Sequence, residues 1–423
     1  MKILRTGDAL TVTRNLEDNI DSEREAVQRI LASVKKEGDA ALLEWTKTFD
    51  HVTLSSLQVS EQEIKEAYEA IDQKTITLIK EAAQNIETYH KNQVRASWFM
   101  TNEEGTLLGQ KVTPLAAAGV YVPGGTAAYP SSVLMGVIPA KVAGVSRIVL
   151  TSPPMRNGKL TPAVIVAANE CGVHEMYKVG GAQAIGALAY GTQSIAAVDK
   201  IVGPGNLYVA LAKKEVFGTV GIDALAGPSE IAILADETAN AAYVAADLLS
   251  QAEHDVRAAA VLVTTSETLA QEVKQHVALQ LEQLPRRAIA AQALDTYGLI
   301  YVASSIEEGI NIINELAPEH LEIMTRDPYQ ELASIKHAGA IFLGRYSSEP
   351  VGDYFAGSNH VLPTSGSARF SSGLSVDDFV KKSSVIAYSQ QALKHHGEKI
   401  AAFARLEGLE AHARAVELRL EEQ

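Results

Sequence analysis

The chain has 423 residues, of which 47% are hydrophobic and 21% charged, a balance typical of a folded globular protein with more than one core. Its 37 Lys and Arg against 51 Asp and Glu give a formal net charge of -14, which argues against nucleic acid and anionic membrane surfaces as partners. Cys171 is the only cysteine, so an internal disulfide is excluded and any metal site must use nitrogen and oxygen ligands. The start of the chain does not resemble a signal peptide and no long apolar run occurs, so we expect a cytoplasmic protein without a membrane span.

The N-terminal quarter of the chain predicts helices. Apolar residues at helical spacing run from Val27 to Val34, and Gly38 then marks a stop. Ser60 to Glu63 form a capping-box pattern, which predicts the start of another helix. No group of residues suited to catalysis occurs in this region, so we interpret it as scaffold.

From Gly119 onward, short apolar runs alternate with Gly- or Pro-containing turns and with helical stretches. This alternation is typical of βαβ units and a parallel sheet. We expect an α/β fold with two sheets of about four strands each, and one larger doubly wound sheet is the alternative. The chain is expected to be helical again beyond residue 375. The predicted strands are 119–122, 148–150, 176–179, 200–202, 231–234, 260–263, 299–302 and 340–343.

The turns after these strands are the first places to look for a ligand, because open parallel sheets bind ligands beyond the carboxyl ends of their strands. Gly203 to Asn206 begins like a dinucleotide-binding fingerprint, but Tyr208 stands where the third glycine should be. A tight turn without a ligand explains the same residues. The motif alone is therefore weak evidence for a nucleotide.

Gln251 and His254 lie three residues apart near the end of a predicted helix. This spacing places both side chains on one helix face, where they could bind a metal together with Asp353 through nitrogen and oxygen atoms. The alternative is a helix end at which Gln251 faces water and His254 interacts with the helix dipole. The residues alone favour this second interpretation.

Glu319 and His320 are adjacent, and such a pair could divide two proton-transfer tasks between a carboxylate and an imidazole. A helix start after Pro318 is the alternative. The stretch 352–370 that follows is rich in glycine and hydroxyl residues and has no periodicity, which favours a functional loop. His412 lies on the apolar face of the last predicted helix and is interpreted from the residues as an interior or interface histidine.

A series of motifs, in order from about residue 120 to the end, resembles the histidinol dehydrogenase family. One such motif would be weak evidence, whereas the ordered series is highly specific. The motifs are VYVPGG (120–125), VGGAQA (179–184), GPGN (203–206), AGPSE (226–230), SQAEH (250–254), PEHL (318–321), GD (352–353) with NHVLP (359–363), and EGLEAH (407–412).

The resemblance implies an enzyme that oxidises L-histidinol to L-histidine through L-histidinaldehyde with two NAD molecules, in the last steps of histidine biosynthesis. Glu319 and His320 would be the catalytic acid–base residues, with His320 the base for the alcohol and Glu319 activating water. Zinc would bind to Gln251, His254, Asp353 and His412. The substrate would contact Ser229, Gln251, His254, His320, Asp353, Glu407 and His412, and NAD would contact Tyr121, Gln183 and Asn206.

The resemblance also implies two Rossmann-like parallel-sheet domains with helical extensions, in an intertwined homodimer whose C-terminal segment reaches the partner's site. A metal-dependent hydrolase, in which Glu319 activates a metal-bound water, is the alternative function, and it would act without NAD. The expected domains are an N-terminal extension (1–20), a larger α/β domain (21–119 with 231–373), an NAD-side α/β domain (120–230) and a C-terminal helical dimerisation segment (374–423).

Overall fold

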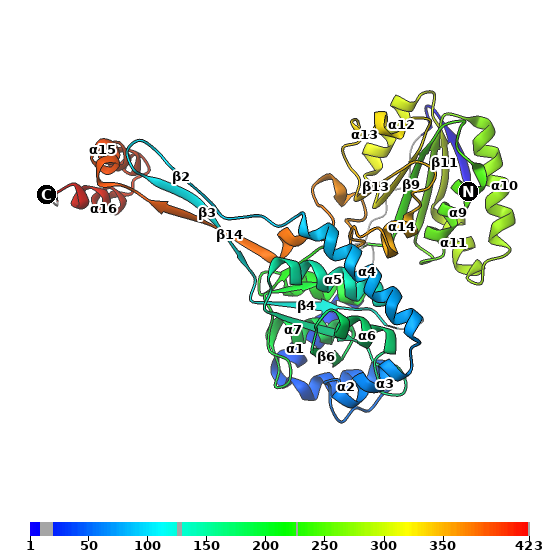
Figure 1. Cartoon of the computed structure of the whole chain (residues 1–423), viewed down its shortest axis with the longest axis horizontal. Coiled ribbons are helices and arrows are strands. Elements are labelled where there is room, and N and C mark those ends of the chain that lie inside the picture. The colour runs from blue at the N-terminus through cyan, green and yellow to red at the C-terminus, as the bar shows by residue number, and fades with distance from the viewer. Residues whose placement is uncertain (9–19, 125–128, 226, 422–423) are drawn as a thin grey trace. The chain divides into compact units, whose positions relative to one another are not determined.

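The computed structural model describes residues 1–8, 20–124, 129–225 and 227–421 (Figure 1). Most of the expected N-terminal extension, together with Gly125 and Ala226 of the expected motifs, lies outside these described residues. The chain divides into two compact units, called here unit 1 (Met1–Gln93 with Ala116–Phe379) and unit 2 (Val94–Leu115 with Val380–Gln423). The domain boundaries expected from the sequence stay a prediction.

The N-terminal region of unit 1 is helical, as predicted. Ser60 and Glu63 form the expected capping box, because each side chain accepts a hydrogen bond from the backbone N–H of the other. The apolar stripe from Val27 to Val34 is buried in the same core as helix α7 (Gly181–Tyr190). The helices of this region are α1 (Asp21–Glu37), α2 (Asp39–Phe49), α3 (Glu61–Glu69) and α4 (Gln73–Lys91).

A five-stranded parallel sheet in unit 1 has the strand order β6-β5-β4-β7-β8. Four of its strands were predicted, and the sequence analysis missed the two-residue strand β8. The strands are β4 (Ala117–Tyr121), β5 (Arg147–Ser152), β6 (Glu175–Lys178), β7 (Lys200–Val202) and β8 (Gly221–Ile222). The helices between them are α5 (Pro130–Ala143), α6 (Pro162–Glu170), α7 (Gly181–Tyr190) and α8 (Leu207–Val216).

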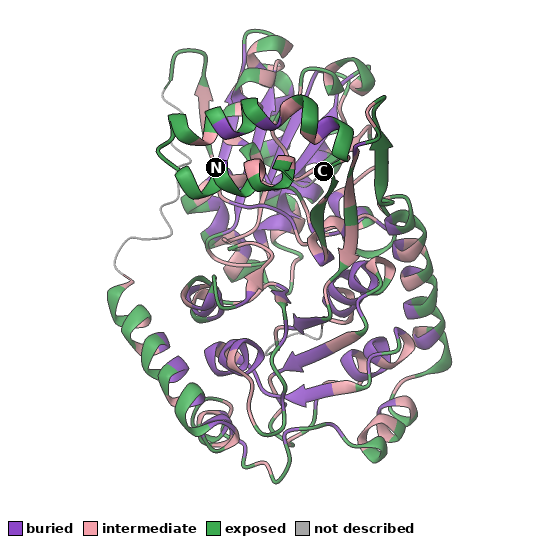
Figure 2. Ribbon diagram, turned by 90° about the vertical axis from the view of Figure 1, so that its left-hand side faces the viewer, coloured by how far each residue is buried: buried purple, intermediate pink, exposed green. Residues whose placement is uncertain are grey.

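A six-stranded parallel sheet, also in unit 1, has the order β1-β11-β10-β9-β12-β13. Its strands β9, β10 and β12 are almost wholly buried, as is the central strand β4 of the five-stranded sheet, and Figure 2 draws buried residues in purple. The strands are β1 (Lys2–Arg5), β9 (Glu230–Ala235), β10 (Ala259–Thr264), β11 (Gly298–Val302), β12 (His320–Met324) and β13 (Ala340–Leu343). The helices are α9 (Ala241–Ala252), α10 (Glu267–Leu281), α11 (Arg287–Tyr297), α12 (Ile306–Leu316), α13 (Pro328–Leu332) and α14 (Glu349–Tyr354).

The structure rules out the alternative of a helix start after Pro318, because strand β12 begins there. The chain does not start a helix after Pro318, but enters a buried strand that pairs with β9 and β13 on its two sides. The stretch 352–370 contains the end of α14 and a short 3-10 helix (Ser367–Arg369), and is otherwise irregular, as expected. A second 3-10 helix (Val376–Phe379) ends unit 1.

Unit 2 contains a three-stranded antiparallel sheet in the order β14-β3-β2, followed by two helices. The expectation that the chain is helical again from about residue 375 is wrong over β14, whose residues pair with a strand far away in the sequence, and is confirmed over the two helices that follow. The elements are β2 (Trp98–Thr101), β3 (Leu107–Pro114), β14 (Val380–Ala387), α15 (Gln390–Leu406) and α16 (Glu410–Glu421). No helix among the described residues of either unit is long and apolar enough to cross a membrane.

Candidate functional site

A buried acid–base pair stands at the start of β12. Glu319 and His320 are 6% and 3% exposed, and β12 pairs with β9 so that His320 lies beside Ile231. Glu319 Oε2 accepts a hydrogen bond of 2.9 Å from the backbone N–H of Glu230, and His320 Nδ1 lies 3.1 Å from the Glu230 carbonyl oxygen. One peptide segment of β9 therefore orients both side chains.

Helix α14 supplies two carboxylates to the same place. Asp353 Oδ1 lies 3.8 Å from His320 Nε2, and Glu349 Oε1 lies 4.0 Å from the same nitrogen. His360, in the loop after α14, places its Nδ1 3.8 Å from Asp353 Oδ2. Neither Glu349 nor His360 was expected from the sequence to have a role in the site. The spacing of four residues between Glu349 and Asp353 is the signal that could have found Glu349, once a helix was placed there.

Three groups of this cluster have pKa values raised to neutral pH or above. Burial raises the pKa of Glu319 to about 7, and burial together with the charge of Asp353 raises the pKa of Glu349 to about 8. Burial opposes the charge on His320, but the carboxylates around it outweigh burial and raise its pKa to about 10. Burial also opposes the charge on Asp353, yet His320 and His360 hold the pKa of that carboxyl below its usual range. Groups with such pKa values suit acid–base chemistry.

Two of the expected metal ligands in unit 1, Gln251 and Asp353, carry oxygen atoms of the kind that bind a divalent cation. Gln251 is fully buried at the end of α9, and neither its amide oxygen nor its amide nitrogen has a hydrogen-bond partner among the described residues. The interpretation that Gln251 faces water is therefore wrong. A buried amide without partners costs free energy, which a ligand would offset. Of the expected ligands, Asp353 lies in a group with His320 and Glu349 whose nitrogen and oxygen atoms are within 4.8 Å of one another. Oxygen and nitrogen donors of this kind suit zinc, although His320 and Glu349 were not among the expected ligands.

His254 follows the end of α9 and is exposed. It lines a cavity of about 420 Å³ together with Ser229 and Asn206. The two remaining expected site residues belong to unit 2, where Glu407 follows α15 and His412 lies exposed on α16.

The expected NAD residues line a second cavity in unit 1, of about 950 Å³. Tyr121 ends β4 and its hydroxyl accepts a hydrogen bond of 3.2 Å from the N–H of Gly181. Gln183 lies in the first turn of α7, and the side chain of Asn206 caps α8. These residues stand at carboxyl ends of strands and at helix N-termini, where nucleotide phosphates bind. The cavity therefore suits a dinucleotide.

Asn206 lines both cavities, so the nucleotide side and the site of Ser229 and His254 adjoin within unit 1. The acid–base pair nevertheless stands at the amino end of β12, not beyond the carboxyl end of a strand as the rule for parallel sheets suggested. Asp50, whose pKa burial raises to about 6, also lines the larger cavity and was missed by the sequence analysis.

Glu322 and Asp247 form a second pair of buried carboxyl groups, and Glu322 accepts a hydrogen bond from the start of α14. Glu322 on β12 is 1% exposed, and its Oε1 accepts a hydrogen bond of 2.8 Å from the backbone N–H of Glu349 at the start of α14. Burial and the charge of Asp247 on α9 raise the pKa of Glu322, and burial raises the pKa of Asp247 to about 6. Folding therefore shifts both acids toward the protonated form relative to the unfolded chain.

Glu322→Gln is expected to make the stability less dependent on pH. A carboxyl group whose pKa is raised by folding stabilises the fold below its unfolded pKa of about 4 and loses that contribution as pH rises through its folded pKa. The introduced amide would keep the acceptor for the N–H of Glu349 without adding charge, so we expect a free energy of unfolding about 1 to 3 kcal/mol above wild type at about pH 8 and near wild type at about pH 5. Urea denaturation at both pH values measures this. The exposed Glu282→Gln serves as control, and a parallel pH dependence in all three proteins would contradict the expectation.

Two parallel sheets that carry a buried acid–base pair, a nitrogen and oxygen donor set and a cavity suited to a dinucleotide define an α/β enzyme that uses a nucleotide and a metal. Comparison with known proteins specifies it further. Residues 13–420 match the family model described as histidinol dehydrogenase. Histidinol dehydrogenase of Geobacillus kaustophilus is 64% identical over 421 residues, covering 100% of this chain and 99% of that protein. That of Bacillus subtilis is 58% identical, covering 99% and 98%.

A solved structure of histidinol dehydrogenase from Elizabethkingia anophelis has a TM-score of 0.95 with 40% sequence identity, covering 100% of this chain and 98% of that one. The chain belongs to the histidinol dehydrogenase family. Histidinol dehydrogenase activity in histidine biosynthesis, with dependence on NAD and zinc, follows from this membership.

Proposed function

We propose that the chain oxidises L-histidinol to L-histidine through L-histidinaldehyde at the cluster around Glu319 and His320, reducing two NAD molecules in turn. The observation that carries the proposal is the fixed pair itself, buried and oriented by Glu230 directly beside Asp353. Oxidation of an alcohol needs a base for the hydroxyl proton while the hydride leaves for the nicotinamide.

His320 takes the hydroxyl proton. Its Nδ1 lies against the Glu230 carbonyl oxygen, which can only accept, so in the neutral ring the proton sits on Nδ1 and Nε2 is the nitrogen that can act as the base. Nε2 has no hydrogen-bond partner among the described residues. When bound, zinc would orient and polarise the amino alcohol.

Glu319 acts in the second half of the reaction. The aldehyde must take up water before a second hydride can leave, and a carboxyl group with a pKa of about 7 can accept the proton of that water. In this proposal Gln251, His254 and Asp353 hold the metal together with His412. Ser229, Gln251, His254, His320, Asp353, Glu407 and His412 contact the substrate, and Tyr121, Gln183 and Asn206 contact NAD.

We further propose that the enzyme is an intertwined homodimer in which residues 374–423 reach the partner's site with Glu407 and His412. The composition of unit 2 supports this, because the buried hydrophobic residues among its described residues are three alanines, Ala392, Ala401 and Ala413. A unit with so small a core depends on further burial.

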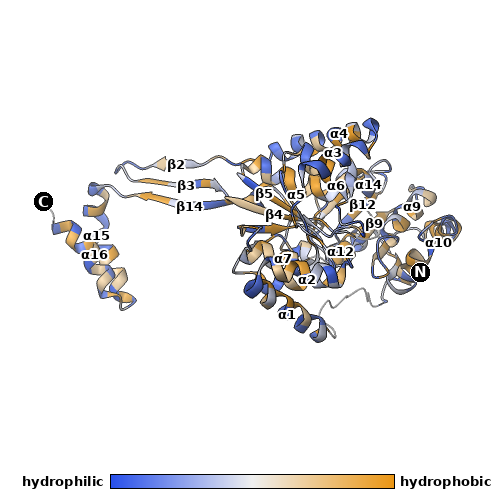
Figure 3. Cartoon of the chain, turned by 90° about the horizontal axis from the view of Figure 1, so that it is seen from below, coloured by the Kyte–Doolittle hydropathy of each residue, from blue (hydrophilic) through white to orange (hydrophobic). Residues whose placement is uncertain are grey.

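The large apolar side chains of unit 2 are instead exposed, and Figure 3 shows hydrophobic residues along both its strands and its helices. An exposed apolar surface of this kind is typical of a protein interface, and a second copy of the chain would cover it. The side chains include Trp98 (51% exposed), Phe99 (53%), Ile386 (69%), Phe403 (65%) and Leu406 (81%). The proposal also places the enzyme in the cytoplasm, without nucleic acid or a membrane as partner.

Zinc-replete protein is expected to form two NADH for each L-histidinol consumed, because alcohol and aldehyde are oxidised in turn. Absorbance of NADH and chromatography of L-histidine measure both products. A chelator should abolish NADH formation, and zinc should restore it. Substrate turnover without NAD would favour the metal-dependent hydrolase, and absence of NADH from metal-replete protein would overturn the proposal.

A further inference from the structure

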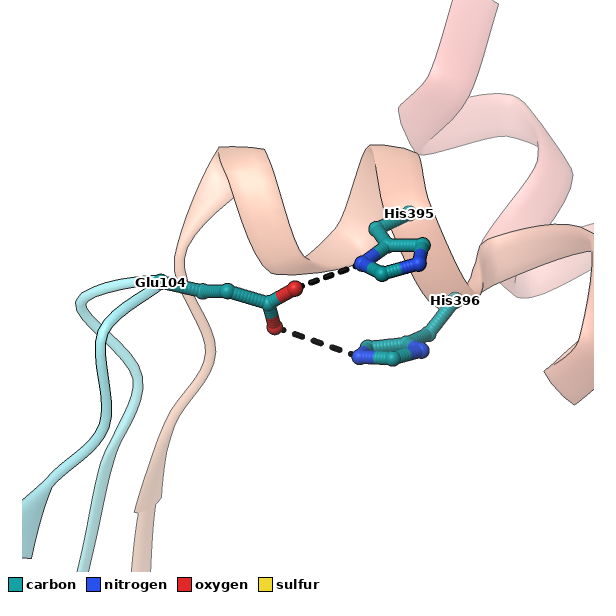
Figure 4. Close-up of side chains that lie close together, drawn as sticks. All are labelled: Glu104, His395 and His396. Atoms are coloured by element: carbon teal, nitrogen blue, oxygen red, sulfur yellow. Dashed lines mark hydrogen bonds and ion pairs between the residues drawn. The ribbon is translucent and has the colours of Figure 1, made fainter.

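Unit 2 contains a cluster of two histidines and one glutamate that the reaction does not use (Figure 4). Glu104 lies in the connection between β2 and β3, and His395 and His396 are consecutive residues of α15. His395 Nδ1 lies 2.6 Å from Glu104 Oε1, and His396 Nε2 lies 3.2 Å from Glu104 Oε2. One carboxylate thus meets two imidazoles, one at each oxygen.

Consecutive residues of a helix point about 100° apart, yet the side chains of His395 and His396 both reach Glu104. They stack with their centroids 4.4 Å apart and their planes 15° from parallel. Each ring therefore presents a nitrogen to the same carboxylate, and a single cation could be shared by both rings and that carboxylate.

The donor atoms stand close to the spacing that a metal ion needs. Metal–ligand distances of about 2.0 to 2.2 Å at tetrahedral angles separate neighbouring ligand atoms by about 3.3 to 3.6 Å. The nitrogen–oxygen separations here are 2.6 and 3.2 Å, and all three donor atoms lie within 4.8 Å of one another. Small side-chain rotations therefore suffice to admit an ion.

We propose that Glu104, His395 and His396 form a second divalent transition-metal site, separate from the catalytic cluster. Two imidazoles favour zinc, nickel or cobalt over magnesium and calcium, which prefer oxygen ligands. The side chains of His395 and His396 are 61% and 34% exposed, so water completes the coordination.

The bound ion links the β2–β3 connection to α15, because Glu104 lies in the connection and His395 and His396 lie on the helix. Ser389 already joins the two segments, because its hydroxyl donates to the carbonyl oxygen of Glu104 and accepts from the N–H of Ala392 at the start of α15. A metal adds a link from the same connection to the second turn of the helix. Its role is to stabilise unit 2, since Glu104, His395 and His396 have no part in the proposed proton transfers.

Equilibrium dialysis of the full-length, zinc-replete protein against zinc tests the proposal, with metal content measured by mass spectrometry. Wild type should hold one more zinc per chain than Glu104→Gln or His396→Gln. His174→Gln, which changes an exposed histidine elsewhere, is the matched control and should retain the additional ion. Cobalt absorption spectra give an independent measure of nitrogen coordination.

The additional zinc should also raise the melting temperature of wild type but not of the two cluster variants. All variants should keep wild-type NADH formation, which shows that they are folded and separates this test from that of the catalytic proposal. If one of the two cluster variants, Glu104→Gln or His396→Gln, fails to fold, the zinc content of the other variant tests the proposal. Equal zinc content in wild type and a folded cluster variant would overturn the proposal and leave the cluster as an ion pair alone.

Discussion

His320→Gln is expected to lower kcat for L-histidinol oxidation by about 10²- to 10⁴-fold while the zinc content stays near that of wild type. The amide can still donate toward the Glu230 carbonyl oxygen, which lies 3.1 Å from His320 Nδ1, so the side chain should stay in place. It cannot accept the hydroxyl proton at neutral pH. Steady-state NADH formation and metal analysis on the same preparations measure the two quantities.

His174→Gln is the control for replacing a histidine by glutamine, and it should leave both activity and zinc unchanged. The comparison separates the proposed base from a structural or metal-binding role. If zinc were lost from the His320 variant along with activity, His320 would be a metal ligand and its assignment as the base would be wrong. Retention of full activity would exclude it from proton transfer altogether.

Much of the parallel architecture could be read from the sequence, because apolar runs ending in Gly- or Pro-rich turns carry a local signal. Strand β12 lacked that signal, since it begins with His320 and contains Glu322, and polar residues in a short strand do not look buried. The sheet of unit 2 could not be predicted either. It pairs β14 with β3, which are separated by more than half of the chain, and no local pattern specifies such a pairing.

The candidate site was likewise predictable in part. Adjacent residues such as Glu319 and His320 are visible as a pair in the sequence, and the family motifs give them roles. Their geometry depends on the backbone of Glu230 on a neighbouring strand, which brings its N–H and C=O to them only when β9 and β12 pair. Glu349 joins the cluster through helix α14, where its spacing of four from Asp353 is a signal only once the helix is known. His360 joins it through the loop after α14, and that contact has no signature in residue spacing.

Two inactive variants are expected to restore activity when they are refolded together. His320→Gln changes the acid–base pair of unit 1, whereas His412→Asn changes the proposed ligand on α16 of unit 2. If unit 2 of each chain serves the partner's site, a mixed dimer has both changes in one site and neither in the other. Random mixing makes half of the dimers mixed, so activity should return to about a quarter of wild type.

A pair of variants that both change unit 1, His320→Gln and Glu319→Gln, is the matched control. Every site of their mixed dimer carries one of the changes, so mixing should restore nothing. Each variant refolded alone sets the baseline, and size-exclusion chromatography shows that dimers have formed. If His412 served the site of its own chain, the first mixture would stay at the baseline as well. Recovery in the first mixture only therefore requires both a dimer and a site completed by the second chain.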